Sequence, residues 1–140
     1  MTWWSCAPFT SEAALADWLL DTSWGGRSWA AVPKDGGPAV GRFMASHRLE
    51  GVAEIGHLVA KERQGEGIAR ECLSALLTHL FRTEGYRRVY ADVDPDNAAS
   101  NRLVERLGFT LEGRMRGQWH THIGVRDSLI WGILSDEWVG

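Results

Sequence analysis

The stretch Gln64-Gly65-Glu66-Gly67-Ile68-Ala69 decides the fold, because it joins an apolar run at residues 55–59 to a long amphipathic segment that begins near Ile68. The order of strand, glycines and helix start predicts an anion-binding turn. The first N–H groups of a helix have no partner inside the helix, the helix dipole adds partial positive charge there, and glycine lets a phosphate approach the backbone. We therefore expect a ligand that carries a phosphate or pyrophosphate group.

Two common phosphate-binding loops do not fit this stretch. A dinucleotide-binding turn needs a third glycine where Arg70 stands. A nucleotide P-loop needs Lys and then Ser or Thr after its last glycine, whereas Ile68 and Ala69 follow Gly67. A plain glycine-rich turn between a strand and a helix stays open as the alternative for this stretch alone, so the rest of the chain has to decide.

The segments around and after this turn resemble, in order, the acetyl-CoA-binding core of the Gcn5-related N-acetyltransferase (GNAT) superfamily. Gln64-x-x-Gly67-x-Ala69 matches the pyrophosphate loop of that superfamily, (Gln/Arg)-x-x-Gly-x-(Gly/Ala). Asn97-x-x-Ser100, followed by Leu107-Gly108-Phe109, resembles the Rim-type branch, whose best-known members acetylate protein N-termini. Three shorter matches extend the resemblance, which covers residues 29–138: Glu112-Gly113-x-x-Arg116, Gly124-Val125-Arg126-Asp127 and Asp136-Glu137-Trp138.

Composition and charge agree with one globular unit. The chain has 140 residues, of which 44% are hydrophobic and 24% charged, enough for a single continuous core, so we expect one acetyl-CoA-binding N-acetyltransferase domain over residues 1–140. A net charge of -3 with scattered Lys and Arg argues against a nucleic acid as partner. Apolar runs are short and the start of the chain lacks a signal-peptide pattern, so we expect no membrane association and a cytoplasmic location.

Hydrophobic spacing and turn residues predict the order of the elements. A helix capped by Thr10 or Ser11 runs to about Leu20, and a helix over residues 68–83 and another over 98–107 follow later. The buried side of the first helix is expected to carry four residues: Ala14, Leu15, Trp18 and Leu19. Strands are predicted at residues 29–32, 39–45, 52–59, 88–93, 109–118 and 127–134. This is the α+β order of a GNAT fold, with a mixed, mostly antiparallel sheet and helices on both faces.

The chain departs from the Rim-type pattern at its start. Chains of that branch usually open with a strand and a helix before the segment that corresponds to Thr10, whereas only residues 1–9 precede it here. The resemblance therefore predicts a fold without its first strand, which uncovers apolar surface at one sheet edge. Five tryptophans are candidates to cover that edge, by packing or by a contact in a homodimer, with ordinary core positions as the alternative for two of them, Trp18 and Trp29: Trp3, Trp4, Trp18, Trp24 and Trp29.

The resemblance also implies how acetyl-CoA is held. In the family, pantetheine pairs like an added strand, which assigns it to the backbone of His57, Leu58 and Val59. Arg63 and Arg70 flank the pyrophosphate turn and would pair with phosphates, a solvated basic edge being the alternative. The turn itself would hold the pyrophosphate through six residues: Gln64, Gly65, Glu66, Gly67, Ile68 and Ala69.

Catalytic roles follow from the same resemblance. Glu54 occupies a position where related enzymes carry the general base, with an exposed sheet glutamate as the bland alternative and Asp127 as a competing base. Val104 stands where many GNAT enzymes have an acidic tyrosine, so Ser100 is the candidate to protonate the CoA sulfur. Asn97 would fix pantetheine through its amide. Both Asn97 and Ser100 also fit the start of a helix, where they would act as caps.

Cysteine and histidine spacing predicts no metal site. Cys6 and Cys72 fit no metal or redox motif, and Cys72 falls on the apolar face of the long helix, as a core thiol would. His120 and His122 flank one residue in a predicted hairpin loop, but no nearby ligand completes a tetrahedral set.

The reaction that the resemblance implies is direct transfer of acetyl from the cosubstrate acetyl-CoA to a primary amine, without a covalent enzyme intermediate. The acceptor it favours is the α-amine of a protein or peptide N-terminus. One alternative is a small amine such as an aminoglycoside, for which an acidic cleft would be needed. The other is a protein that binds acetyl-CoA without turning it over. Four carboxylates are candidates for the acidic cleft: Glu54, Asp92, Asp94 and Asp127.

Overall fold

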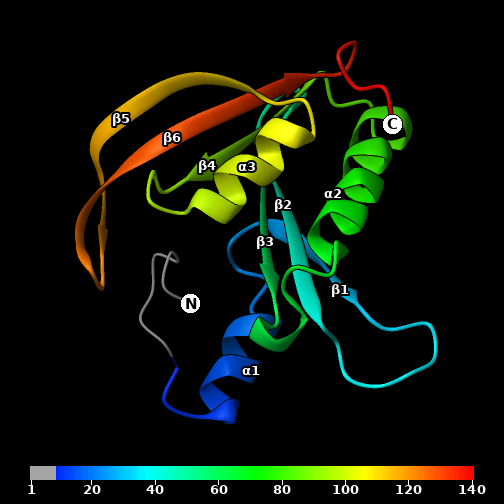
Figure 1. Ribbon diagram of the computed structural model, residues 1–140, viewed down its shortest axis with the longest axis vertical. Coiled ribbons are helices and arrows are strands. Elements are labelled where there is room, and N and C mark those ends of the chain that lie inside the picture. Colours follow the sequence, from blue (N-terminus) through cyan, green and yellow to red (C-terminus); the bar gives the residue numbers. More distant parts are fainter. Residues whose placement is uncertain (1–8) are drawn as a thin grey trace.

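The computed structural model describes residues 9–140 as a single six-stranded sheet with three α-helices (Figure 1). The strands lie in the order β1-β2-β3-β4-β6-β5, and all neighbours are antiparallel except β3 and β4, which are parallel. The predicted α+β fold with a mixed sheet is confirmed. Its elements are α1 (Glu12–Leu20), β1 (Gly26–Ala31), β2 (Gly41–Leu49), β3 (Val52–Val59), α2 (Ile68–Thr78), β4 (Arg88–Val93), α3 (Ala98–Arg106), β5 (Thr110–Thr121) and β6 (Gly124–Leu134).

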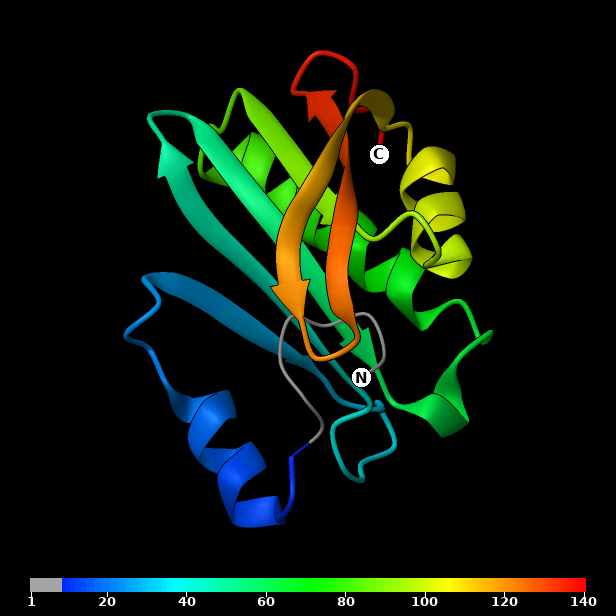
Figure 2. The ribbon, with the colours of Figure 1, turned by 90° about the vertical axis from the view of Figure 1, so that its left-hand side faces the viewer.

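Helices cover both faces of the sheet, as predicted. α2 lies behind the sheet in Figure 2, and α2 and α3 share one apolar core with the strands. A π-helical turn, His79–Thr83, continues α2 and completes the helix predicted to Thr83. Each fully buried leucine of α2 contributes about 1.5–3 kcal/mol relative to an exposed one. The centre of this core consists of fully buried residues from both helices and two strands: Leu73, Leu77, Val89, Val104 and Ile133.

Helix α1 covers the opposite face and is held there by aromatic and cationic side chains. Ser11 is its N-cap and accepts a hydrogen bond from the Ala14 N–H at 3.1 Å, which confirms the predicted start. The guanidinium of Arg42 lies 4.6 Å from the ring centre of Trp18 and 5.9 Å from that of Trp24, at cation–π distance. The prediction that Leu19 is buried is wrong, since this residue is 38% exposed. Trp18 and Trp24 contact the sheet through Arg42, whereas Leu19, which the apolar spacing assigned to the buried side, remains exposed.

The β5–β6 hairpin is longer than predicted. β5 ends at Thr121 and β6 begins at Gly124, so His120 lies on a strand and only His122 lies in the turn. The prediction that both histidines occupy a loop is therefore wrong for His120. Polar residues without alternation suggested a loop, but a turn at residues 122–123 closes the hairpin. The positive φ (106°) falls on Gly124, directly after the turn, as in a hairpin whose type I turn is followed by a left-handed glycine. The Thr121 hydroxyl donates to the Gly124 carbonyl at 2.9 Å.

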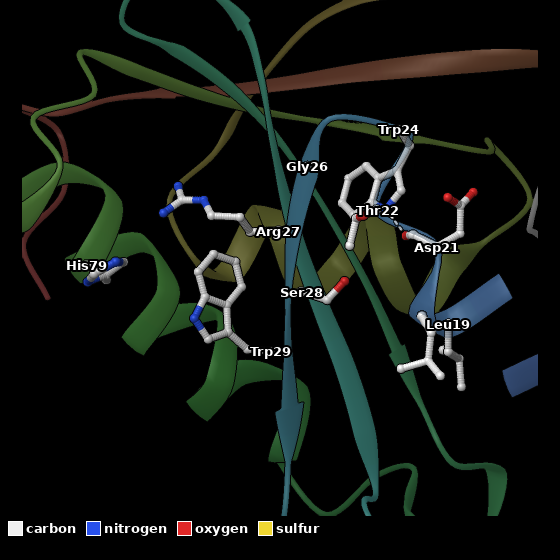
Figure 3. A pocket seen from close by; sticks show the side chains of 10 residues that line it. Leu19, Asp21, Thr22, Trp24, Gly26, Arg27, Ser28, Trp29 and His79 are labelled. Carbon is white, nitrogen blue, oxygen red and sulfur yellow. Dashed lines mark hydrogen bonds between the residues drawn. The ribbon is translucent and has the colours of Figure 1, made fainter. Parts of the chain in front are cut away.

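Strand β1 forms one edge of the sheet. Within residues 9–140 no strand precedes α1, whereas residues 1–8, with Trp3, Trp4 and Cys6, lie outside the described part. A cavity of about 520 Å³ runs along this edge (Figure 3). Trp24 and Leu19 line it on the α1 side, and Arg27, Trp29 and His79 line it on the α2 side. Arg27 forms an ion pair with Glu84, and the His79 Nε2 lies 2.6 Å from the same carboxylate.

In the described part of the chain, no helix combines the length and the apolar character needed to cross a membrane.

Candidate active site

The two parallel strands, β3 and β4, are paired over only part of the length of β3. Their pairing begins at Val52 and Arg88 and ends at Ile55 and Ala91, although β3 continues to Val59. On its other side, β3 stays paired with β2 as far as Val59. Among the described strands, none pairs with residues 56–59 on the β4 side, so this backbone edge can receive an extended ligand as an added strand would be received. His57, Leu58 and Val59, the residues predicted to hold pantetheine, all lie in this segment.

His57 belongs to the same face of β3 as the core residues Ala53 and Ile55. Its ring stacks on Phe43, with 6.3 Å between ring centres and an angle of 10° between planes. Burial lowers the pKa of His57 to about 4, so the imidazole is neutral at neutral pH. A neutral, stacked ring at the start of the open segment presents no positive charge to a ligand there.

The turn that follows β3 has the conformation that only glycine adopts easily. Gly65 and Gly67 both have φ of +84°, and a Cβ at either position would meet no atom within 4 Å. Gly67 is the N-cap of α2, and its carbonyl accepts the first helical bond, from the Glu71 N–H at 3.0 Å. The N–H groups of residues 68–70 therefore begin the helix without partners inside it, next to two glycines whose Cβ positions are open.

The side chain of Gln64 ties this turn to the open strand segment. Its amide donates to the Val59 carbonyl at 3.1 Å. The turn and the end of β3 therefore keep a fixed relation. Arg63 pairs with Glu66 inside the turn at 2.8 Å, and this guanidinium lowers the pKa of the Glu66 carboxyl. Arg70 is exposed on the first turn of α2 and takes part in none of the ion pairs found in residues 9–140.

Glu54 borders the point where the strands separate. It pairs with Tyr90 across the parallel ladder, one residue before the last pair, and its side chain points to the face opposite α2. The Tyr90 hydroxyl donates to its carboxylate at 3.0 Å, and Arg48 pairs with it at 2.6 Å, leaving the side chain 21% exposed. Burial first, and then the Glu54 charge, raise the pKa of Tyr90. Sequence reasoning missed both partners, because only the strand register brings them together.

Asp127, the competing base, belongs to the hairpin. Its carboxylate accepts from the Gly117 N–H at 2.8 Å and pairs with Arg114 at 2.7 Å. The Gly117 N–H and the Arg114 guanidinium lower the pKa of Asp127, which makes it a weaker proton acceptor. Its neighbour Asp94 pairs with Arg126 at 2.7 Å in the loop after β4.

Asn97 and Ser100 lie at the start of α3, directly after the loop that follows β4. The Asn97 side chain accepts from the Ser100 N–H at 3.2 Å, so the N-cap interpretation of Asn97 is confirmed, while its contact with a ligand stays a prediction. Ser100 lies in the first helical turn and is half-buried. The cap uses the side-chain oxygen of Asn97. The side-chain nitrogen, which is predicted to hold pantetheine, takes no part in this hydrogen bond.

Asn101, which sequence reasoning missed, holds the loop before α3. Its amide nitrogen donates to the carbonyls of Asp94 at 3.0 Å, Pro95 at 3.3 Å and Asn97 at 3.0 Å. Its oxygen accepts from the Trp131 indole at 2.9 Å. One side chain therefore fixes the path of the backbone that carries Asn97 and Ser100. The available signal was a polar residue four positions after the cap, which places Asn101 on the same side of the helix as Asn97.

Cys72 packs against the core cluster, and burial raises the pKa of its thiol. The core-thiol prediction is confirmed for Cys72, whereas Cys6 lies outside the described residues. A thiol with a raised pKa is a poor nucleophile at neutral pH.

An opened parallel pair followed by a glycine turn at a helix N-terminus places this chain in a class of α+β protein whose open strand edge and turn can receive an extended, phosphate-bearing ligand. A family model described as "Acetyltransferase (GNAT) domain" matches residues 1–110, and the chain belongs to this GNAT family. This confirms the resemblance seen in the sequence.

Named relatives agree with that assignment. A proposed ribosomal N-acetyltransferase of Bacillus subtilis strain 168 is 33% identical over 101 residues, 70% of this chain and 55% of that protein. The ribosomal-protein-serine acetyltransferase of Escherichia coli K12 is 37% identical over 74 residues, 53% of this chain and 41% of that protein. The chain thus spans about half the length of these curated relatives.

Solved structures share the fold. A GCN5-related N-acetyltransferase from Brucella melitensis superposes with a TM-score of 0.86 at 28% identity, over 98% of this chain and 64% of that one. A spermidine N-acetyltransferase from Vibrio cholerae gives a TM-score of 0.80 at 21% identity, over 100% of this chain and 85% of that one, and shows the fold alone.

Proposed function

We propose that this chain is an acetyl-CoA-dependent N-acetyltransferase that transfers acetyl directly to a primary amine. The observation that carries the proposal is the separation of β3 from β4 immediately before the glycine turn. A ligand that is amide-rich at one end and anionic at the other matches a free strand edge followed by unpaired helix N–H groups. Membership of the GNAT family supports the same ligand.

The residues present fit acetyl-CoA. The backbone of His57, Leu58 and Val59 would pair with the pantetheine arm, and the amide nitrogen of Asn97 would hold it from the other side. The turn from Gln64 to Ala69 would hold the pyrophosphate, because the open space at Gly65 and Gly67 admits it to the backbone. Arg70 is exposed and available to the phosphates, whereas Arg63 would have to leave Glu66 to reach them.

Acetyl-CoA would supply an activated acetyl group as a thioester. Glu54 would take the proton of the acceptor ammonium, which must be lost before the amine attacks. A backbone N–H of the open β3 segment would stabilise the oxyanion, and Ser100 would donate a proton to the departing sulfur. We prefer Glu54 to Asp127 as base because Glu54 borders the point where β3 and β4 separate, whereas Asp127 is tied into the β5–β6 hairpin by Gly117 and Arg114. The raised pKa of Cys72 favours direct transfer over an acyl-cysteine route.

For the acceptor, we favour the α-amine of a protein or peptide. Two relatives bear names that refer to ribosomal or ribosomal-protein acetylation, and the Asn97 to Ser100 segment matches the Rim-type branch. Acetylation of a small amine is the second candidate. The carboxylates near the opening, Glu54 and Asp92, support it. A chain that binds acetyl-CoA without turnover is the third.

A cytoplasmic location and a homodimer belong to the same proposal. The edge strand β1 and the cavity along it support association, because an unpaired edge invites a further strand or a second copy. Light scattering on the purified chain tests whether it is a dimer. A monomer at all concentrations would remove the dimer from the proposal and leave the activity untouched.

The activity is tested by thiol release from acetyl-CoA with three acceptor arms: peptides of varied N-terminal residue, the polyamine spermidine and the aminoglycoside kanamycin. We expect release with peptides. Calorimetry with CoA is the companion measurement. Failure to bind CoA would overturn the whole proposal, whereas binding without release in any arm would favour the non-catalytic alternative.

A further inference from the structure

The four carboxylates that the sequence proposed for an acidic cleft differ in their bonding partners: three have an arginine partner and one has neutral donors. Glu54 pairs with Arg48, Asp94 with Arg126 and Asp127 with Arg114, each within 2.8 Å. The fourth, Asp92, takes part in none of the ion pairs found in residues 9–140. Of the four, it is the one carboxylate that forms no ion pair with an arginine in the described part of the chain.

Asp92 is held by two neutral donors instead. The Ser128 hydroxyl, which is fully buried on β6, donates to Oδ1, and the Trp119 indole donates to Oδ2 at 2.9 Å. Trp119 lies on β5, beyond β6, so its side chain crosses β6 to reach β4. A bulge between Met115 and Trp119, with Gly117 at φ of 60°, shifts the strand register before this residue. Both donors come from a hairpin that passes across the front of the sheet in Figure 2.

The position of Asp92 relates it to the proposed reaction. It is the residue of β4 that follows Ala91, the last one paired with β3, so it stands at the start of the opening. It shares a strand face with Tyr90, the hydrogen-bond partner of Glu54. Asp92 and the proposed base therefore border the same end of the opening, on the face away from α2.

Two neutral hydrogen bonds fix the carboxylate without cancelling its charge. A carboxylate has about four acceptor sites, and the two donors occupy one on each oxygen. The remaining sites can accept hydrogen bonds from a cation. An ammonium group with three donors is the natural complement, and the acceptor of an N-acetyltransferase is an ammonium ion at neutral pH.

We propose that Asp92 binds the ammonium group of the acceptor and so determines that this transferase selects a cationic amine. The inference rests on the proposed function and adds a residue to its acceptor side. Asp92 holds the ammonium through charge-assisted hydrogen bonds, while Glu54 removes one proton so that the nitrogen lone pair can attack. The ammonium can come from a peptide N-terminus or from a polyamine, and both sources enter the test.

The test compares Asp92→Asn with Glu112→Gln in thiol release from acetyl-CoA. Glu112 is the matched control, because its carboxylate also contacts β4 but pairs with Arg88 at 2.5 Å. The acceptors are an alanine-starting pentapeptide and spermidine. Loss of a charged hydrogen bond predicts that KM for the amine rises about 10- to 100-fold in Asp92→Asn, while KM for acetyl-CoA stays within about twofold. Glu112→Gln keeps both values. Asp92→Glu, which restores the charge, gives an intermediate KM.

A second measurement does not need turnover. Calorimetry on the CoA-loaded protein compares the pentapeptide with its N-acetylated form, which lacks the charge. The wild-type chain binds the amine more tightly, and Asp92→Asn loses that preference while thermal melting shows it folded. An unchanged KM and preference in Asp92→Asn, or an equal loss of CoA affinity, overturns the inference. If the wild-type chain releases no thiol, the proposed function fails, and the wild-type preference for the amine still decides the role of Asp92.

Discussion

Substitution of Gly67 by valine tests ligand binding at the turn separately from folding. Gly67 has φ of +84° and ψ of −4°, where an L residue carries about 1–2 kcal/mol of backbone strain, and a β-branched one carries more. No atom lies within 4 Å of the new Cβ, so no clash adds to that cost. We therefore expect the free energy of unfolding to fall by about 2 kcal/mol, and the melting temperature by several degrees.

The same side chain fills the space through which a phosphate would reach the backbone of residues 68–70. Loss of one or two hydrogen bonds to a charged group costs about 3 kcal/mol, or about 100-fold in Kd for CoA. Gly85→Val is the matched control. Gly85 also has positive φ (73°) and open space at its Cβ position, but it follows the π-helical turn at the end of α2 opposite to the glycine turn. Calorimetry with CoA on both variants measures Kd and shows whether the loss is specific to the glycine turn. A normal Kd in Gly67→Val, or an equal loss in Gly85→Val, would refute the assignment of this turn.

Three further outcomes test other residues. Glu54→Gln should lower kcat most below the pKa of the acceptor amine and leave Kd for CoA within about twofold, and wild-type kcat over the whole pH range would remove Glu54 as base. Ser100→Ala should lower kcat more modestly, because water also protonates a thiolate whose conjugate acid has a pKa of about 8.5. Asn101→Asp replaces the donor of three hydrogen bonds by an oxygen, so KM for acetyl-CoA should rise about 10-fold and the free energy of unfolding should fall by about 1–3 kcal/mol, whereas unchanged KM would limit Asn101 to stability.

The elements that position the coenzyme site could be predicted from local sequence. β3 and β4 begin and end at the predicted residues, since each is an apolar run bounded by turn residues. The glycine turn was predictable because a positive φ at two positions restricts the residue type. Ser11 and Asn97 were recognisable as caps for a similar reason, as their side chains bond to a backbone N–H three residues on.

The acceptor side could not be predicted in the same way, because its contacts join residues that are far apart in the sequence. Tyr90 meets Glu54 only through the register of a parallel pair, and Trp119 meets Asp92 only because a bulge lets it cross β6. Local patterns carry no record of either. For the same reason sequence reasoning grouped the four carboxylates as candidates for one acidic cleft, whereas the structure gives arginine partners to three of them and neutral donors to Asp92.

The two sides of the proposed coenzyme site are held by different parts of the chain, and this explains how the opening keeps its shape. On one side, the Gln64 amide joins the glycine turn to the end of β3, so strand edge and turn form one unit with α2. On the other side, Asn101 and the Trp131 indole hold the loop that starts α3. No strand pairing joins the two sides beyond Ile55 and Ala91 in the described residues. Their separation is set by the core beneath them, where Leu73 of α2 and Val104 of α3 are both fully buried. A close-packed core resists changes of even one methylene, so the width of the opening is a property of the core, and the chemistry above it depends on residues that never contact a ligand.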